Sequence, residues 1–367
     1  MKIAFVFGPF TIGNRHIDFT KLWDSPRGLT GSELSCISMA REMAKLGHSV
    51  SFFVQNPNAP SFDGVQLREY GNLPSESYSY DAVYSWMGPD DLRGVDPRAV
   101  RLVNQQLNDF GYCRPGYDSF VDIYTSPSQS HMEYIRGLTP SPHKWTVLPN
   151  GCDPGLYDRS AKVSGRVIYA SSPDRGLHLL LQAWPHIKRR APHAHLRVFY
   201  NMEGWITTFL PQEDHQIPDF VEFGRRARYI DLSMKRMASL DVERVGSVSR
   251  NRMDREMSEA EVLAYPCDTV RFTEGFSVTT MEACASGAFP VVSAVDSLGQ
   301  IYGDHVPMVP APVRDHMAEF TDRAVRALND PTYRRSVTER ASVLARDHSW
   351  SALARRLEGI LAAAIKR

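Results

Sequence analysis

The hydrophobic pattern of the chain alternates between short apolar runs and longer segments with helical periodicity. Residues 2–8 form a continuous apolar run, which is typical of a buried parallel strand. A long polar loop covers residues 11–31, and residues 32–46 then carry apolar side chains at helical spacing. A second apolar run at residues 49–54 completes a strand–helix–strand unit, which folds as a right-handed crossover. The first half of the chain therefore predicts a parallel α/β sheet.

The same alternation restarts after a turn-rich break at residues 152–165, where we place the domain junction. We predict an α/β protein of two doubly wound, Rossmann-like domains that face a cleft. The N-terminal domain is expected at residues 1–152 and the C-terminal domain at residues 153–349. A last helix is expected at residues 350–367. Residues 201–241 show no clear pattern and predict one irregular helix.

The stretch 271–287 places two carboxylates around a predicted helix start. Glu274 lies in the loop before the helix and Glu282 inside it, with Ser277 as a candidate N-cap and Gly287 as a candidate C-cap. The first amides of a helix have no internal partners and attract anions, above all phosphate. Carboxylates on either side indicate a ligand that also carries hydroxyls, such as a sugar or a ribose. The alternative is that both are ordinary solvated glutamates.

Composition and charge narrow the class of protein. The 367 residues suffice for two domains of ordinary size. Lysine plus arginine number 42, as do aspartate plus glutamate, so bulk electrostatics favours neither nucleic acid nor an anionic membrane as a partner, although a local basic groove stays possible. No apolar run approaches a membrane span, and no leader precedes the first strand. The five scattered cysteines predict reduced, mostly buried thiols in a cytoplasmic protein, without metal-ligand spacing.

Several motifs occur in a fixed order along the chain. Glu274 and Glu282 are separated by seven residues, and Leu-Pro-Asn-Gly-Cys-Asp stands at the predicted domain crossover. This ordered set resembles the retaining glycosyltransferases of the GT-B fold, in particular glycosyltransferase family 4. Besides the Leu-Pro-Asn-Gly-Cys-Asp motif at residues 148–153, the matching segments are residues 31–33, 46–50, 172–177, 245–249, 261–266 and 349–350. The resemblance covers nearly the whole chain. It implies that the N-terminal domain is the acceptor side, that the C-terminal domain binds the nucleotide sugar, and that the helix at residues 350–367 packs back on the first domain.

The resemblance implies a role for each matched residue. Glu282 would hydrogen-bond the donor ribose, Glu274 would accept from hydroxyls of the transferred sugar, and Arg175 would neutralise the diphosphate leaving group. Asp109 is the titratable group nearest to the position where many family members carry a histidine, and we take it as a catalytic candidate. The other donor-binding residues expected from the resemblance are Gly275, Phe276, Ser277, Val278, Ser172, Thr30, Gly31 and Ser249.

Acceptor contacts are expected from the first long loop, which faces the cleft in this architecture. The candidates are His16, Asp18 and Arg27. Ser171 and Ser172 stand where family members carry an arginine, so a second cation is expected from elsewhere, with Arg271 and Arg252 as candidates. His131 and the arginines at positions 225, 226 and 228 are more typical of solvated positions than of ligand contacts.

The sequence thus predicts a cytoplasmic, metal-independent hexosyl- or pentosyltransferase without a cofactor. It would move a sugar, with retention, from a nucleotide-diphosphate sugar to a glycan, a small metabolite or a modified nucleic-acid base. A sugar-nucleotide epimerase and a catalytically degenerate nucleotide-sugar-binding protein remain the alternatives. A dinucleotide-dependent dehydrogenase is disfavoured, because no Gly-x-Gly-x-x-Gly follows a predicted strand.

Overall fold

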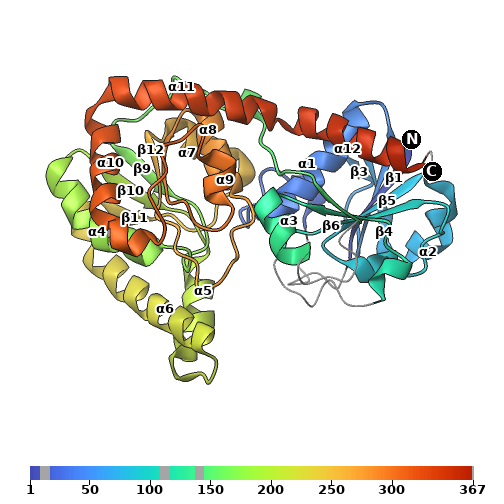
Figure 1. Cartoon of the computed structure of the whole chain (residues 1–367), viewed down its shortest axis with the longest axis horizontal. Helices are drawn as coiled ribbons and strands as arrows, with labels where there is room; N and C mark the ends of the chain where they lie inside the picture. The colour runs from blue at the N-terminus through green and yellow to red at the C-terminus, as the bar shows by residue number, and fades with distance from the viewer. Residues whose placement is uncertain (9–16, 108–115, 137–143, 366–367) are drawn as a thin grey trace. The chain divides into compact units, whose positions relative to one another are not determined.

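The computed structural model describes residues 1–8, 17–107, 116–136 and 144–365, and the chain divides into two compact units (Figure 1). Unit 1 comprises Met1–Leu22, Leu29–Gly151 and His348–Arg367. Unit 2 comprises Trp23–Gly28 and Cys152–Asp347. The short segment Trp23–Gly28, which the sequence places in the first domain, therefore groups with the second unit.

Unit 1 contains an eight-stranded sheet within its described residues, in the order β3-β4-β2-β1-β5-β6-β7-β8. All neighbouring strands are parallel except β3 and β4. The strand order reverses at β1, so the loops after β1 and β5 flank the position where doubly wound sheets bind ligands. The strands are β1 (Lys2–Phe7), β2 (Ser49–Val54), β3 (Ser61–Phe62), β4 (Val65–Glu69), β5 (Ala82–Trp86), β6 (Val100–Asn104), β7 (Ile123–Ser126) and β8 (Trp145–Val147).

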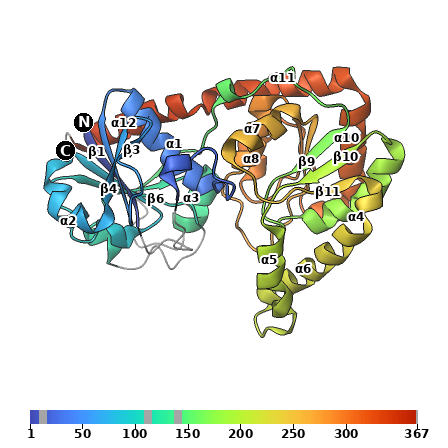
Figure 2. The same cartoon turned by 180° about the vertical axis from the view of Figure 1, so that it is seen from behind.

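Helices from both the N-terminal and the C-terminal parts of the chain pack against this sheet. The C-terminal helix α12 lies against α1, the helix of the first crossover (Figures 1 and 2). The α-helices of unit 1 are α1 (Gly31–Lys45), α2 (Leu73–Glu76), α3 (Gln129–Arg136) and α12 (Trp350–Ile365). Helix α1 begins with a capping box, in which the side chains of Thr30 and Glu33 bind each other's backbone amides.

Unit 2 contains a five-stranded, all-parallel sheet in the order β11-β10-β9-β12-β13. The order reverses between β9 and β12, so the loops after these two strands flank the switch point. The strands are β9 (Arg166–Tyr169), β10 (His195–Val198), β11 (Val242–Arg244), β12 (Val262–Tyr265) and β13 (Phe289–Val292). The α-helices are α4 (Leu177–Arg190), α5 (Met202–Phe209), α6 (Pro218–Arg236), α7 (Arg250–Glu259), α8 (Val278–Ser286), α9 (Leu298–Tyr302), α10 (Met317–Asn329) and α11 (Pro331–Asp347).

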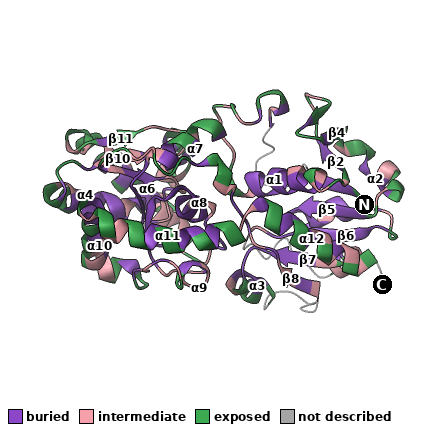
Figure 3. Cartoon of the chain, turned by 90° about the horizontal axis from the view of Figure 1, so that it is seen from above, coloured by how far each residue is buried: buried purple, intermediate pink, exposed green. Residues whose placement is uncertain are grey.

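The core of unit 2 surrounds its central strands. Strands β12 and β13 are buried along their whole length, which explains why their sequences are continuous apolar runs. Helix α8 is almost entirely buried as well, polar side chains included (Figure 3). The predicted pair of doubly wound α/β domains is thus confirmed as two units with parallel sheets.

The structure differs from the sequence prediction at residues 201–241. In place of one irregular helix, α5 and α6 pack against each other and are joined through the 3-10 segment Leu210–Asp214 (Figure 2). The short helix α9 is also absent from the sequence prediction. Four cysteines, Cys36, Cys152, Cys267 and Cys284, are free and buried, as predicted, and Cys113 lies outside the described residues. None of the described helices is long and apolar enough to cross a membrane.

Candidate active site

The start of helix α8 is built as the sequence predicts. The hydroxyl of Ser277 accepts from the amide of Thr280 at 3.2 Å, and Gly287 ends the helix in the left-handed conformation with φ of 77°. Both cap predictions are therefore confirmed. The hydroxyl of Tyr302 donates to the carbonyl of Ser277 at 2.7 Å and fixes the entry of the chain into the helix. Because the first amides of a helix have no partners within it, this buried helix start presents donors to an anion.

Glu274 is held in place through its backbone. Its own amide and that of Thr273 each donate to Oδ2 of Asp296 at 2.9 Å, and the residue is only 5% exposed. Its Oε2 accepts from Nη1 of Arg175 at 2.8 Å and from the hydroxyl of Tyr265. No donor among the described residues contacts Oε1, which leaves this oxygen available to a ligand hydroxyl. Two predicted catalytic residues, 99 positions apart in the sequence, are thus brought together.

Arg175 lies in the turn between β9 and α4. Gly176 follows it with φ of 104°, and a Cβ atom there would lie 1.9 Å from the carbonyl oxygen of Pro266. Glycine is therefore required, both for its backbone conformation and for the close approach of the two loops. The side chain of Ser172 bonds Asp174 of the same turn. The predicted donor contact of Ser172 would therefore have to come from its backbone or replace this bond.

The charge of Arg175 is strongly favoured. Burial alone would lower the pKa of its guanidinium, but the neighbouring acidic groups, led by the carboxylate of Glu274, together more than reverse this, and the pKa lies above its ordinary value. The side chain is 29% exposed, and its buried Nε has no hydrogen-bond partner among the described residues. This Nε is closed to solvent, so a ligand oxygen would meet Nη2, which makes no hydrogen bond with the described residues.

Glu282 lies deeper in the helix and already has a cation. It is 3% exposed, and its Oε1 lies 2.7 Å from Nη1 of Arg250. The other terminal nitrogen of this arginine, Nη2, donates to the hydroxyl of Tyr157 at 3.0 Å and to Oδ1 of Asp254. Burial raises the pKa of Glu282 to about 7, although Arg250 opposes the shift. Sequence analysis missed Arg250. The sequence feature that could have identified it is its position directly after the N-cap Ser249, in the first turn of α7, from which its side chain contacts α8.

The two arginines proposed from the sequence as second cations are placed elsewhere. Nε of Arg252 lies 3.5 Å from Oε1 of Glu256 on the same helix, and Arg271 is exposed in the loop before Glu274. Neither contacts Arg175, Glu274 or Glu282 in a described interaction. Apart from Arg175 in the turn after β9, the arginine that pairs with one of the two carboxylates is therefore Arg250, which contacts Glu282.

The segment Trp23–Gly28 contacts the start of α7. The amide of Asn251 donates to the carbonyl of Trp23 at 3.1 Å, and its side chain donates to Oδ1 of Asp24 at 2.8 Å. Gly28 has φ of 70°, and a Cβ atom there would lie 2.5 Å from the carbonyl oxygen of Val248. Ser249, a predicted donor-binding residue, caps α7 by accepting from the amide of Arg252 at 3.3 Å. This segment therefore borders the stretch that the sequence assigns to the nucleotide.

The predicted residues of the first loop are divided between the two units. Asp18 belongs to unit 1, where Oδ1 accepts from Thr20 and Asn58, and these hydrogen bonds lower its pKa. Arg27 belongs to the Trp23–Gly28 segment of unit 2. Thr30 and Gly31 form the start of α1 in unit 1, with the Thr30 hydroxyl engaged in its own cap. The predictions for His16 and Asp109 fall outside the described residues.

Unit 1 has a buried carboxylate that sequence analysis missed. Asp91, which follows β5, accepts from the hydroxyls of Tyr70 at 3.0 Å and Ser85 at 3.1 Å, and burial raises its pKa to about 6. Added Cβ atoms at Gly8 and Gly88 would overlap this carboxylate, so both glycines make room for it. The residue thus fixes the loops after β1 and β5 to each other. The paired glycines after these strands are the only sequence signal for it that we find.

Two further polar residues of unit 1 are internal. His131 is fully buried and hydrogen-bonds Ser126, so the expectation that it is solvated is wrong. Its pKa is lowered to about 4 by burial, which keeps the ring neutral. Asn150 of the crossover motif accepts from Ser35 at 2.7 Å and donates to Gln106 at 2.8 Å. The crossover motif therefore links α1 to the end of β6.

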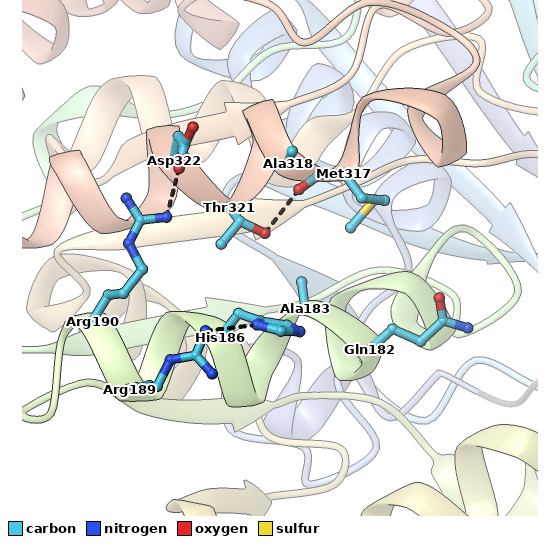
Figure 4. Close-up of a pocket in the computed structure, with 9 residues that line it drawn as sticks. All are labelled: Gln182, Ala183, His186, Arg189, Arg190, Met317, Ala318, Thr321 and Asp322. Carbon is cyan, nitrogen blue, oxygen red and sulfur yellow. Dashed lines mark hydrogen bonds and ion pairs between the residues drawn. The ribbon is translucent and has the colours of Figure 1, made fainter.

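A surface cavity of about 400 Å³ lies between α4 and α10, away from all the predicted site residues (Figure 4). Its charged side chains pair with one another. Arg190 binds Asp322 at 2.5 Å and Arg189 contacts His186 at 3.1 Å, and Met317 also lines the cavity. Among the residues that the structure describes, no group of three His, Cys, Asp or Glu side chains is placed to hold a metal ion.

Two Rossmann-like units in one chain define the GT-B fold, and solved structures share it. AviGT4, a glycosyltransferase involved in avilamycin A biosynthesis, is 17% identical, with a TM-score of 0.69 over 100% of this chain and 98% of that one. Sucrose-phosphate synthase from Thermosynechococcus elongatus is 16% identical, with a TM-score of 0.70 over 100% and 99%. Anabaena HepE in complex with UDP-glucose is 14% identical, with a TM-score of 0.66 over 99% and 100%.

The family comparison concerns the second unit. Residues 167–343 match the family model described as glycosyl transferases group 1. Arg175, Glu274 and Glu282 thus lie within the segment that this family model matches. No curated protein matches the sequence.

Proposed function

We propose that this protein is a retaining glycosyltransferase that moves a sugar from a nucleotide-diphosphate sugar to a hydroxyl acceptor. The observation that carries the proposal is the 2.8 Å ion pair between Arg175 and Glu274. It joins the loops after β9 and β12, which flank the switch point of the unit 2 sheet, where ligands of such sheets bind. A cation for a diphosphate and a carboxylate for sugar hydroxyls stand side by side there.

The proposed mechanism uses Arg175 as the positive charge on the leaving diphosphate. Charge on the phosphate oxygens grows as the glycosidic bond breaks, and a fixed cation stabilises that charge most in the transition state. Glu274 orients the transferred sugar through its free Oε1. The leaving phosphate takes the proton of the acceptor hydroxyl on the same face of the sugar, so no side chain forms a covalent bond. The charge comes from arginine, and we accordingly propose that neither a metal nor a cofactor is required.

The donor ribose is assigned to Glu282. This role rests on the family motif and on the position of Glu282 on the helix that follows Glu274. The pairing of Glu282 with Arg250 at 2.7 Å holds its carboxylate in one orientation. We further propose a cytoplasmic location, which the four free, buried cysteines support. The acceptor is left as a hydroxyl compound.

The first test measures nucleotide binding by thermal shift with UDP, ADP and GDP in the presence of EDTA. A ligand at about 100 times its Kd stabilises the folded chain by roughly 2.7 kcal/mol. We expect one diphosphate to raise the melting temperature of the wild type, and Arg175→Met to reduce that rise to what the nucleoside part alone gives. Arg189→Met, which changes an exposed arginine of the α4–α10 cavity, is the matched control and should behave as the wild type. The proposal fails if no nucleotide diphosphate stabilises the wild type.

The second test separates transfer from the two alternatives. Glu274→Gln should still bind the nucleotide diphosphate but lose turnover of the nucleotide sugar, measured as nucleotide release. An epimerase would instead return a new nucleotide sugar in the absence of any acceptor, and a degenerate binder would release no nucleotide. NMR of the product anomer decides between retention and inversion.

A further inference from the structure

Arg226 contacts two active-site loops at once from a third element. It lies in α6, the helix that sequence analysis did not resolve, and is 3% exposed. Its Nη1 donates to the carbonyl of Asp174 at 2.5 Å and also to the carbonyl of Asp268. Its Nη2 donates to Oδ2 of Asp268 at 2.8 Å, and its Nε donates to Oε1 of Glu222 at 2.9 Å. The expectation of a solvated arginine at this position is therefore wrong.

The two loops that Arg226 joins are those that carry the proposed catalytic pair. Asp174 directly precedes Arg175 in the turn after β9. Asp268 lies in the loop after β12 that leads to Glu274. The loops also meet where Gly176 approaches the carbonyl of Pro266 and where Arg175 pairs with Glu274. A planar guanidinium can bind both loops because its donors point in fixed, different directions.

We propose that Arg226 is a positioning residue that holds the turn of Arg175 against the loop of Glu274. This inference rests on the proposed function and adds a residue to it that the motif does not contain. Arg226 acts on the ligand only through Arg175, because its own donors are taken by Asp174, Asp268 and Glu222. Helix α6 is thereby linked, through Arg226, to the two loops that form the proposed phosphate site.

The network around Asp268 indicates that the fold survives loss of Arg226. Nη2 of Arg314, whose side chain is 58% exposed, donates to Oδ1 of Asp268 at 3.0 Å and would remain as a partner. Nε2 of His178 lies 3.8 Å from Oδ2 of the same carboxylate. Burial, together with Arg226, lowers the pKa of His178 to about 3, so its ring is neutral at physiological pH. Asp268 would therefore keep one cation and one neutral neighbour in Arg226→Met.

The test is a double-mutant cycle on nucleotide affinity. The wild type, Arg226→Met, Arg175→Met and the double variant are titrated by calorimetry with the nucleotide diphosphate and with the corresponding nucleoside. We expect Arg226→Met to weaken diphosphate binding by about tenfold or more while nucleoside binding stays unchanged. In the Arg175→Met background, Arg226→Met should have no further effect, because both act through one contact.

Two variants sharpen the interpretation. Arg225→Met changes an exposed arginine of the same helix and should bind the diphosphate as the wild type does. Arg226→Lys keeps the charge without the planar fork and should recover the affinity only in part. Full recovery by lysine, additive effects in the cycle, or equal losses of nucleoside and diphosphate affinity would each overturn the inference. If the wild type binds no nucleotide diphosphate, the proposed function itself fails, which is a separate outcome.

Discussion

Gly176 offers the sharpest test of how the candidate site is built. Replacing it by alanine adds a Cβ atom 1.9 Å from the carbonyl oxygen of Pro266, and real Cβ contacts are essentially never shorter than 3.0 Å. The turn that carries Arg175 and the loop after β12 must therefore separate by about 1 Å, since both partners are backbone. A left-handed residue other than glycine also costs about 1–2 kcal/mol.

The functional effect follows from the displacement. A misplacement of about 1 Å costs a reacting group roughly 100-fold in rate. Gly176→Ala is therefore expected to lower transfer by about that factor and to weaken diphosphate binding, because Arg175 moves with the turn. Gly47→Ala is the matched control. Gly47 has φ of 90°, but an added Cβ atom meets nothing within 4 Å, so this variant carries the backbone strain alone.

The assay pairs urea denaturation with measurement of nucleotide release from the sugar donor. Both variants should lose about 1–2 kcal/mol of stability from the strained backbone, with a larger loss in Gly176→Ala. Only Gly176→Ala should lose activity. The reasoning is refuted if Gly176→Ala turns over within a few-fold of Gly47→Ala, because the two loops would then not need their close contact.

Three other outcomes are expected. Because burial raises the pKa of Glu282 from its ordinary 4.5 to about 7, the folded chain binds this proton more tightly than the unfolded chain, so stability falls as the pH rises between these values. Glu282→Gln should remove that slope in urea titrations, and an unchanged slope would contradict the assignment. In Gly28→Ala the added Cβ atom would push the segment Trp23–Gly28 away from Val248. This should weaken the hydrogen bond from the amide of Asn251 to the carbonyl of Trp23 and speed hydrogen exchange at that amide. Tyr265→Phe removes one donor to Glu274 and should lower turnover about tenfold or more while diphosphate affinity holds.

The parts of the fold that the sequence predicts correctly depend on local patterns. Helix α1, predicted at residues 32–46, spans Gly31–Lys45, and Ser277 and Gly287 cap α8 as expected. Cap residues and apolar runs act on their immediate neighbours, so their signals survive without knowledge of the fold. The pairing of Arg175 with Glu274 could be anticipated only because both loops follow strands of one parallel sheet.

The parts that the sequence does not predict depend on distant partners. The sequence predicts a solvated Arg226 because residues 201–241 show no clear pattern, and only the fold shows that Asp174 and Asp268 bind it. Arg250 lies on α7 and contacts Glu282 on α8, and the position of Arg250 after its N-cap does not reveal this partner in the sequence. The acceptor contact of Asp18 stays a prediction, and the sequence does not show that Thr20 and Asn58 donate hydrogen bonds to one of its oxygens. Buried ion pairs are tertiary features, and their members look like any surface charge in a sequence.

The contact between Arg175 and Glu274 has a consequence for which ligand the proposed site prefers. The pair occupies Nη1 of the arginine and Oε2 of the glutamate, which leaves Nη2 as a donor and Oε1 as an acceptor among the described contacts. A free phosphate would engage the arginine alone, and a free sugar the carboxylate alone. An intact nucleotide-diphosphate sugar carries phosphate oxygens and sugar hydroxyls side by side, so it can use both without breaking the ion pair. The proposed site therefore favours the intact donor over either half, and transfer of the sugar weakens the hold on the nucleotide that must leave.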